Sequence, residues 1–346
     1  MNIRTREGVM SKRDRIIRIL LILIIFSFGT AGTFAQKENK KEKEKTAADY
    51  PQAKPVLWEP VNVKDQDLFN GPGGTEMKPD LSKITFIEED KSGHNKKYRI
   101  KDGAGREWVA KLGDEAQPET VAVRLLYGLG YKTEINYLVP SITIPGKGTF
   151  ENVRLEARPA GVKRLDEWKW SDNPFVGTNQ LQGLKIMMVF LTNYDLLDMQ
   201  NKVLHVKGAN GGELQYVISD LGSTIGKLGN NNLPIFFRLG RKTNDPEAWS
   251  KAGFIKSVEN GQLKMDYTGG KSRGIMDYIT VAQGRWLYDR LAQLTDSQLA
   301  DAFRAANYSA EDVKLLVQAT KDRINSLGRA TGSAPATDAT VQPNTN

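Results

Sequence analysis

Carboxylate and amide side chains gather in the segment NYDLLDMQN, residues 193–201, which directly follows an apolar stretch. Two short apolar runs come next, KVLHV and LQYVI, and a glycine-rich turn separates them. This pattern predicts a β-hairpin. Pairing of the two runs places Asn201 opposite Ser219 and next to Asp220 at the open end of the hairpin.

This group of oxygen atoms favours a bound cation. Asp195 and Asp198 lie in the loop that enters the same end of the hairpin. Carboxylates held close together repel one another unless a positive charge neutralises them, and Mg²⁺ is typically held by one or two carboxylates with phosphate oxygens and water. Asp195 is a candidate base for a hydroxyl nucleophile, which indicates phosphoryl transfer. Asp198 is interpreted as a turn former, and Asp220 with Gly222 also fits a plain strand-ending turn.

A second pair of charged residues lies earlier in the chain. Lys111 stands in the apolar run WVAKL, where a lysine in mid-strand needs a partner, and Glu119 opens the helix expected next. A paired lysine that faces a cleft can hold phosphates. Two alternatives stay open: Glu119 suits the positive end of its helix without any partner, and Lys111 can extend to solvent from an edge strand.

The first half of the chain must position Lys111 and Glu119, and it reads as strands with one helix. Short alternating runs separated by turn residues predict an antiparallel sheet. The helix is expected in PETVAVRLLYGLG, with proline at its start and glycine at its end. The expected strands are 84–90, 97–102, 107–113, 136–144 and 152–159.

The second half must position the acidic loop, and it reads as mainly helical. LQGLKIMMVFL carries an apolar stripe at helical spacing. Two further helices are predicted from capping signals at Thr295 with Gln298 and at Ser309 with Asp312. Since a strand-rich half precedes a helix-rich half, the predicted fold class is α+β with two lobes.

These motifs together resemble the protein-kinase-like superfamily. WVAKLG is similar to the kinase strand with the phosphate-binding lysine, Glu119 to the glutamate of the next helix, NYDLLDMQN to the catalytic loop and ISDLG to the Asp-Phe-Gly motif. The resemblance covers about residues 84–327. The short gap between Lys111 and Glu119 resembles the atypical branch of phosphatidylinositol-kinase-like, HipA-like and CotH-like kinases. GPGG and KLGDEAQPETVAVRLL also resemble a group of exported bacterial proteins.

The resemblance implies a role for each matching residue. Lys111 is expected on the nucleotide phosphates with Glu119 as its ion-pair partner, and Asp195 is expected to be the base. Asn201 and Asp220 are expected to bind Mg²⁺. The implied cofactors are therefore Mg²⁺ and ATP, and the implied partners are a nucleotide and an unknown acceptor, either a protein or a small molecule.

Three departures from the family pattern favour an alternative function. Asn193 and Tyr194 stand where the usual loop has His and Arg, and Asn201 comes one residue late, with Gln200 in the expected place. The loop between the first two strands also has only one glycine. The alternative is an inactive, pseudokinase-type binding module or a structural module of the cell envelope, which export also favours because ATP is scarce outside the cytoplasm.

The first residues of the chain read as an export signal. A basic start, an apolar run and small residues before Gln36 are typical of a secretory signal peptide cleaved near Ala35. The expected location is periplasmic or secreted, with no stable membrane span after cleavage; an uncleaved anchor is the alternative. The predicted division of the chain is signal peptide 1–35, charged linker 36–56, kinase-like domain 57–328 with lobes at about 57–160 and 161–328, and disordered tail 329–346.

Composition excludes several classes of function. The formal net charge of +8 lies mostly in the first 45 residues, so the folded part lacks the basic surface that nucleic acid requires. The chain has no cysteine, which excludes disulfides and thiolate chemistry. Its two histidines cannot build a multi-histidine metal site. Chemistry here must rest mainly on carboxylates, lysine and amides.

Overall fold

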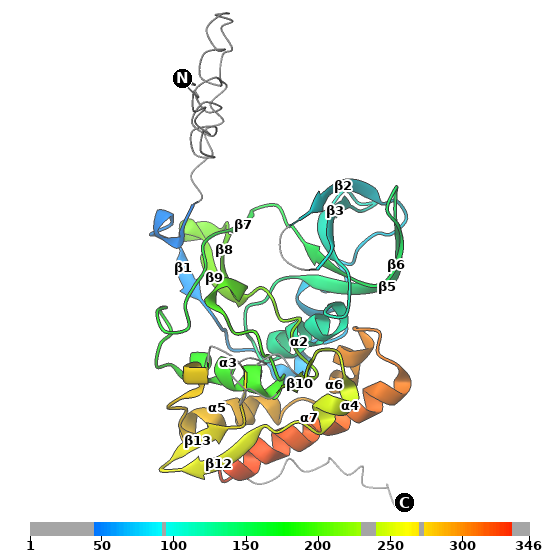
Figure 1. Ribbon diagram of the computed structural model, residues 1–346. Coiled ribbons are helices and arrows are strands. Elements are labelled where there is room, and N and C mark those ends of the chain that lie inside the picture. Colours follow the sequence, from blue (N-terminus) through cyan, green and yellow to red (C-terminus); the bar gives the residue numbers. More distant parts are fainter. Residues whose placement is uncertain (1–44, 92–94, 230–239, 270–272, 334–346) are drawn as a thin grey trace, which may run out of the picture. The chain divides into compact units, whose positions relative to one another are not determined.

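The computed structural model of this 346-residue chain describes residues 45–91, 95–229, 240–269 and 273–333 (Figure 1). The predicted signal peptide and residues 334–346 of the predicted tail lie outside these residues. Residues 329 and 330, expected to begin the disordered tail, instead form the end of a helix. Within them, no helix is both long enough and apolar enough to cross a membrane.

Five antiparallel strands of the first half form one sheet in the order β2-β3-β4-β6-β5. The helix α2 (Ala116–Gly128) is inserted between β4 and β5, so the predicted sheet with one helix is confirmed. β4 is flanked by β3 and β6, and Lys111 at its end therefore does not lie on an edge strand. The strands are β2 (Thr85–Asp90), β3 (Lys97–Lys101), β4 (Glu107–Lys111), β5 (Asn136–Ile144) and β6 (Gly148–Ala157).

The register of this sheet separates apolar from charged side chains. Lys111 pairs with Arg154 and Val109 with Glu156, so these four side chains lie on the same face. The alternate residues, such as Trp108 and those around it, form a compact apolar cluster on the other face. The charged face is the one that presents Lys111 to the rest of the molecule.

A second sheet, in the order β1-β9-β8-β7, contains the predicted hairpin. β8 and β9 pair antiparallel, with Asn201 opposite Ile218. The register thus differs by one residue from the expected pairing of Asn201 with Ser219. The strands are β1 (Lys54–Val56), β7 (Val162–Arg164), β8 (Asn201–Val206) and β9 (Glu213–Ile218).

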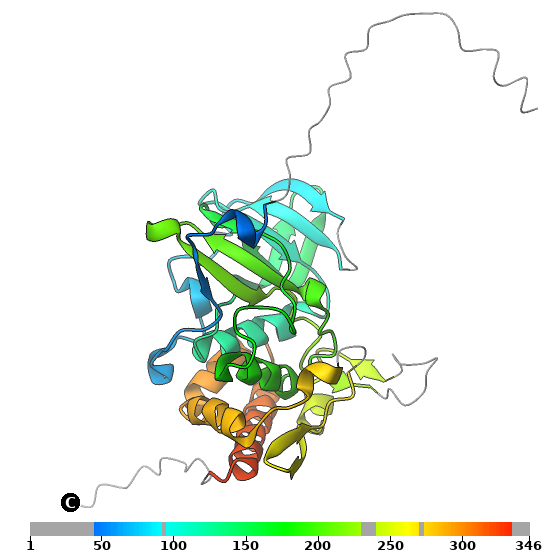
Figure 2. The same ribbon diagram turned by 90° about the vertical axis from the view of Figure 1, so that its left-hand side faces the viewer.

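Part of the segment expected to be linker is folded. β1 pairs in parallel with β9, which Figure 2 shows as the blue segment running beside the green hairpin strands. Ala53, Val56 and Leu57 are buried, and Tyr50 stacks on His205 at 3.9 Å between ring centroids. Pairing with β9 and burial of these apolar side chains stabilise the segment. Ordered structure therefore begins before the expected boundary at residue 57.

The second half of the chain is mainly helical, as predicted. The helices at Thr295 and Ser309 have the predicted N-caps, with each side chain accepting a hydrogen bond from the third helical residue. The helices are α3 (Asn179–Phe190), α4 (Pro246–Ser250), α5 (Val281–Leu291), α6 (Asp296–Arg304) and α7 (Ala310–Ala330). The short strands are β10 (Lys227–Leu228), β11 (Arg241–Lys242), β12 (Ile255–Glu259) and β13 (Gln262–Met265). The 3-10 turns are η1 (Ala47–Asp49), η2 (Val63–Asp65), η3 (Gly71–Gly73), η4 (Asp198–Gln200), η5 (Ala209–Gly211) and η6 (Arg273–Met276).

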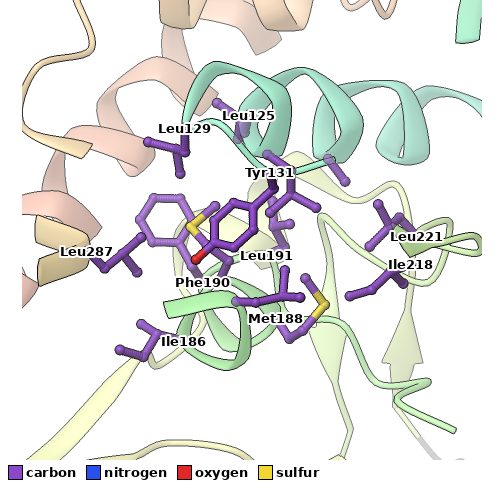
Figure 3. Packing of buried hydrophobic residues seen from close by; sticks show 14 of the residues in the cluster. Leu125, Leu129, Tyr131, Ile186, Met188, Phe190, Leu191, Ile218, Leu221 and Leu287 are labelled. Atoms are coloured by element: carbon purple, nitrogen blue, oxygen red, sulfur yellow. The ribbon is translucent and has the colours of Figure 1, made fainter. Parts of the chain in front are cut away.

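Two apolar cores support the two predicted lobes. The smaller core lies within the five-stranded sheet, and the larger one joins the helices and the hairpin. α2 contributes Leu125 and Leu129 to the larger core, where they lie close to Tyr131 and Phe190 (Figure 3). The α+β, two-lobed fold class is confirmed, with α2 packed chiefly on the helical side.

Candidate active site

Lys111 lies at the centre of a cluster of carboxylates. Its Nζ atom is 2.9 Å from Glu115 Oε2, 3.0 Å from Glu119 Oε2 and 3.0 Å from Asp220 Oδ1. Only 3% of the Lys111 side chain is exposed. Lys111 and Asp220 are 109 residues apart in the sequence, so the fold itself brings them together.

Local structure explains why Glu119 meets Lys111. Gly113, with φ +98°, lets the chain turn from β4 into α2, and this turn places Glu119 in the first turn of the helix. The positive end of the helix dipole favours a carboxylate there. Pairing with Lys111 and attraction to the helix end thus act together on Glu119, and the two interpretations of this residue are compatible.

A glycine allows the Asp220 segment to approach. A Cβ atom on Gly222 would lie 2.5 Å from Glu115 Cβ, closer than real side chains come. Asp220 Oδ1 also accepts a hydrogen bond from the backbone N–H of Gly222 at 3.3 Å. The sequence SDLG therefore ends a strand, as the plain turn interpretation expects, and also sets a carboxylate against Lys111.

The cluster shifts the pKa values of its members. Burial alone would lower the pKa of Lys111, but Glu119, Asp220 and Glu115 together raise it. Burial would raise the pKa of Asp220, and the Lys111 ammonium overcomes this, so the pKa of Asp220 is lowered. Both groups are therefore charged at neutral pH.

Arg154 extends the cluster along the charged face of the sheet. Its Nε atom lies 3.1 Å from Glu119 Oε2, and its Nη2 atom lies 2.9 Å from Glu156 Oε2. Glu156 also pairs with Arg158 and, at 3.4 Å, with Arg164. The sequence patterns did not indicate these residues, because charges within strands leave no local signal for their partners.

The loop that carries Asp195 is held in an unusual backbone conformation. Thr192 has φ +56° and Ile225, which donates its N–H to the Leu191 carbonyl, has φ +51°. β-Branched residues rarely adopt this region, and such positions often occur at functional sites. The Asn193 side chain is buried and accepts a hydrogen bond from the Asp195 N–H at 2.9 Å. Asn193 thus shapes the loop around Asp195.

Gln200 is the amide that contacts Asp195. Its Nε2 atom donates to Asp195 Oδ2 at 2.8 Å. Burial raises the pKa of Asp195, the hydrogen bond from Gln200 lowers it, and the charge of Asp220 raises it, with a net rise. A carboxylate with a raised pKa is a stronger base than an ordinary aspartate.

The Asn201 side chain points into the protein interior, away from Asp195. Its side chain is fully buried and donates through Nδ2 to the Trp168 carbonyl at 3.0 Å. Within the described residues, its Oδ1 atom has no hydrogen-bond partner. The backbone N–H of Ser219 donates to the Gln200 carbonyl at 2.7 Å, so Gln200 takes the position opposite Ser219 that was expected for Asn201. A one-residue change in register moves a side chain to the other face of a strand, and the structure therefore brings together Lys111, Glu119, Asp195 and Asp220 but not the Asn201 amide.

A further cation lies near the loop. The Arg241 guanidinium is 5.0 Å from the centre of the Tyr194 ring, and its charge lowers the pKa of Asp195. Within the described residues, Arg241 Nε is buried without a hydrogen-bond partner. The sequence offered no signal for Arg241, which follows a segment outside the described residues.

The residues present fit a magnesium ion that is held mainly by its substrate. The described part of the chain has no group of three or more acidic or histidine side chains placed to hold a metal by themselves. Mg²⁺ usually needs only one or two protein carboxylates when phosphate oxygens complete its coordination. Asp220, whose side chain is 37% exposed, supplies one such carboxylate.

The order along the chain is the one that the sequence resemblance implies: the lysine strand, the glutamate helix, the Asp195 loop, the hairpin and Asp220. Glu119 and Asp220 both contact Lys111, and Asp195 lies close enough to Asp220 for its charge to raise the Asp195 pKa. The fold is kinase-like. No family model and no curated protein matches the chain. A solved structure similar to it is that of the Helicobacter pylori proinflammatory kinase CtkA, with 12% sequence identity, a TM-score of 0.43 and coverage of 71% of this chain and 96% of the other.

Proposed function

We propose that the protein is an exported phosphotransferase that uses Mg²⁺ and ATP and acts on a hydroxyl acceptor. The observation that carries this proposal is the position of Lys111 Nζ, 3.0 Å from both Glu119 and Asp220. Such an arrangement places a cation for phosphates beside a carboxylate for a metal ion. Export rests on the sequence pattern of residues 1–35.

Each residue has one role in the proposed reaction. Lys111, held by Glu119, binds phosphate oxygens of the nucleotide, and Asp220 holds the metal ion. Bound Mg²⁺ neutralises charge on the phosphates. Asp195 takes the proton of the acceptor hydroxyl while the acceptor oxygen forms a bond to the terminal phosphorus of ATP. The bond from that phosphorus to the bridging oxygen breaks, and ADP leaves with the electron pair.

Gln200 orients the base. Its hydrogen bond fixes one oxygen of Asp195 and leaves the other for the acceptor hydroxyl. Arg241 lies close enough to Asp195 to affect its charge, and it supplies a cation for the transferred group.

The charge of the cluster favours a nucleotide that arrives with its metal ion. Glu115, Glu119 and Asp220 outnumber the two cations that pair with them, Lys111 and Arg154, so the site has an excess of negative charge before any phosphate enters. A free polyphosphate is repelled by this excess. A bound Mg²⁺ would offset this excess, with Asp220 as the residue that would hold it and Lys111 as the residue that would bind the phosphates.

Isothermal titration calorimetry of Mg·ATP into the purified protein tests this function. We expect binding that requires Mg²⁺ and is lost in Asp220→Asn, because the variant removes the metal carboxylate. Asp172→Asn is the matched control, since Asp172 is an exposed aspartate in the helical half. Binding that persists in Asp220→Asn, or that does not need Mg²⁺, contradicts the proposed role of Asp220.

A second candidate is a binding module without catalysis. Asn193 and Tyr194 replace the usual catalytic-loop pair, and the buried Asn193 side chain serves the loop backbone. Under this alternative, ligand binding survives the double substitution Asp195→Asn and Asp220→Asn. Hydrolysis or transfer of the ATP γ-phosphate that depends on Asp195 excludes it.

A further inference from the structure

A cavity of about 480 Å³ lies beside the connection from β6 to β7. Its walls come from the segment 130–135, the connection 157–164 and the hairpin strands β8 and β9. None of its lining residues belongs to β2, β3 or β4, the strands that form the Lys111 side of the sheet. The cavity is therefore separate from the candidate active site, and its volume is within the range of about 300–1,000 Å³ that is typical of small-molecule sites.

Much of the wall is apolar. Leu204 and Val206 alternate along β8 with Val203 and His205, and only the first two line the cavity. Ile135, Pro159 and Val162 add to the apolar wall. A ring or a short hydrocarbon body buries its apolar surface against these side chains.

The polar part of the wall is positively charged where solvent reaches it. The side chains of Arg158, Arg164 and Lys132 are 29%, 32% and 21% exposed. The carboxylates that pair with the two arginines, Glu156 and Glu134, are only 5% and 7% exposed. A third carboxylate, that of Glu59, also lines the cavity and is 41% exposed, but it pairs with Lys132 at 2.7 Å. A ligand that enters beside Arg158 therefore meets a guanidinium group whose own carboxylate partner is buried.

Arg158 is the cation best placed to bind a ligand. Its hydrogen bonds to Glu156 and to the Ala157 carbonyl both use Nη1. Among the described residues, Nε and Nη2 make no hydrogen bond within the protein. Two N–H groups of one guanidinium can bind a carboxylate in a bidentate manner.

Arg164, another lining residue, connects the cavity to the candidate active site. It pairs with Glu134 and donates through Nη2 to Ser219 Oγ at 2.6 Å, next to Asp220. A substitution of Arg164 would thus also disturb the candidate active site. A test of the cavity must use other residues.

We propose that this cavity is a second ligand site, which takes a small organic acid with an apolar body about the size of two fused rings and one carboxylate. The apolar wall receives the body, and Arg158 binds the carboxylate, with Lys132 nearby. The site is distinct from that of the proposed phosphotransfer, because none of its lining residues contacts Lys111, although Glu156 and Arg154 link Arg158 to the Lys111 cluster.

The test is a titration of the purified protein with 2-naphthoate, followed by saturation-transfer NMR and calorimetry, with 2-naphthamide as the uncharged probe. We expect 2-naphthoate to bind and 2-naphthamide to bind about tenfold more weakly, because the amide lacks the charge that Arg158 recognises. Arg158→Gln should weaken 2-naphthoate by about the same factor, and Arg158→Lys should keep more of the affinity.

Lys163→Gln is the matched control. Lys163 lies between the lining residues Val162 and Arg164 on β7, but its exposed side chain is not part of the cavity wall. Its loss should leave the affinity unchanged. Equal weakening by Lys163→Gln and Arg158→Gln would mean that general surface charge attracts the acid, and the proposal would be wrong.

Two further variants test the place of binding. Val206→Trp fills the cavity and should abolish binding of 2-naphthoate. If this variant does not fold, Gln215→Glu places a negative charge in the same wall and should weaken the acid while sparing the amide. No binding of 2-naphthoate by the wild-type protein, or unchanged binding in the folded variants, overturns the proposal.

Discussion

The two cores of this protein hold different halves of one ion cluster. Lys111 belongs to the five-stranded sheet, whose own core is small, whereas Glu119 belongs to α2, which packs into the larger helical core. The N-terminus of α2 is tied to the same side, because Gln117 donates to the carbonyls of Ala306 and Asn307. Besides Glu119, Arg124 links α2 back to the sheet, since it donates to the Asn136 side chain.

The division between the two cores shows which members of the ion cluster are held by the larger core. Glu119 and Asp220 are both attached to the larger core, through α2 and through the hairpin. Lys111 comes from the other core and reaches them across the boundary. The cluster is therefore the point where the sheet is joined to the helical side, and changes to it should affect stability as well as nucleotide binding.

Removal of the joining cation should have the largest effect. Lys111→Met leaves three carboxylates close together with their ammonium partner gone, and breaking a buried ion pair on one side costs about 3–5 kcal/mol. Urea unfolding should show this loss, and Mg·ATP binding should disappear. Lys202→Met, which removes a lysine paired only with the half-exposed Glu167, should cost about 0–1 kcal/mol.

The pH dependence of Lys111→Met sharpens this test. Without the ammonium, the remaining carboxylates repel one another, so their pKa values in the folded state rise above those in the unfolded state. The folded variant then holds protons more tightly than the unfolded chain, and its stability falls as the pH rises. A deficit in unfolding free energy that is the same at pH 4 and pH 8 would contradict the role given to the cluster.

The sequence predicted Lys111 and two of its three carboxylate partners, Glu119 and Asp220, but missed the third, Glu115. Lys111, Glu119, Asp195 and Asp220 lie in recognisable local patterns, and local patterns set their strands, helix and turns. Arg154 and Glu156 were missed because their partners are set by strand register, which links distant segments. Likewise, β1 becomes a strand only by pairing with β9, and nothing within residues 54–56 indicates that partner.

Paired truncations should distinguish the two cores. Leu125→Ala in α2 and Leu155→Ala in β6 remove the same atoms from fully buried positions, and each should cost about 2–5 kcal/mol. Hydrogen exchange should separate them. Leu155→Ala should speed exchange in the five-stranded sheet, whereas Leu125→Ala should speed it in α2, α3 and α5. Faster exchange throughout the molecule in both variants would show that the cores unfold as one unit.

The exchange of roles between Asn201 and Gln200 shows the limit of spacing arguments. Family spacing put an amide five residues after Asp195, where Gln200 stands, but residue type favoured Asn201. β8 begins at Asn201, and the alternation of the strand turns this side chain into the larger core. A sequence defines the first residue of a strand only to within about one residue. That one residue decides whether the amide of Gln200 or that of Asn201 reaches Asp195.

Gln200→Ala should have the smallest effect on the protein. It tests only the side of the site that the larger core holds. The Gln200 amide stabilises the charged form of Asp195, so its loss should raise the pKa of Asp195 further. Since a base must be deprotonated to act, activity rises with pH through this pKa, and the acid limb of the pH profile for ATP turnover should move to higher pH. Turnover on the plateau should fall by about tenfold, which corresponds to the lower end of the range of about 1.5–3 kcal/mol for one hydrogen bond to a charged group. Asn201→Ala is the control, because it alters an amide that is turned into the core. It should lower stability without moving the acid limb of the pH profile. If the acid limb shifts in Asn201→Ala and does not shift in Gln200→Ala, the metal-binding role first expected for Asn201 would be restored.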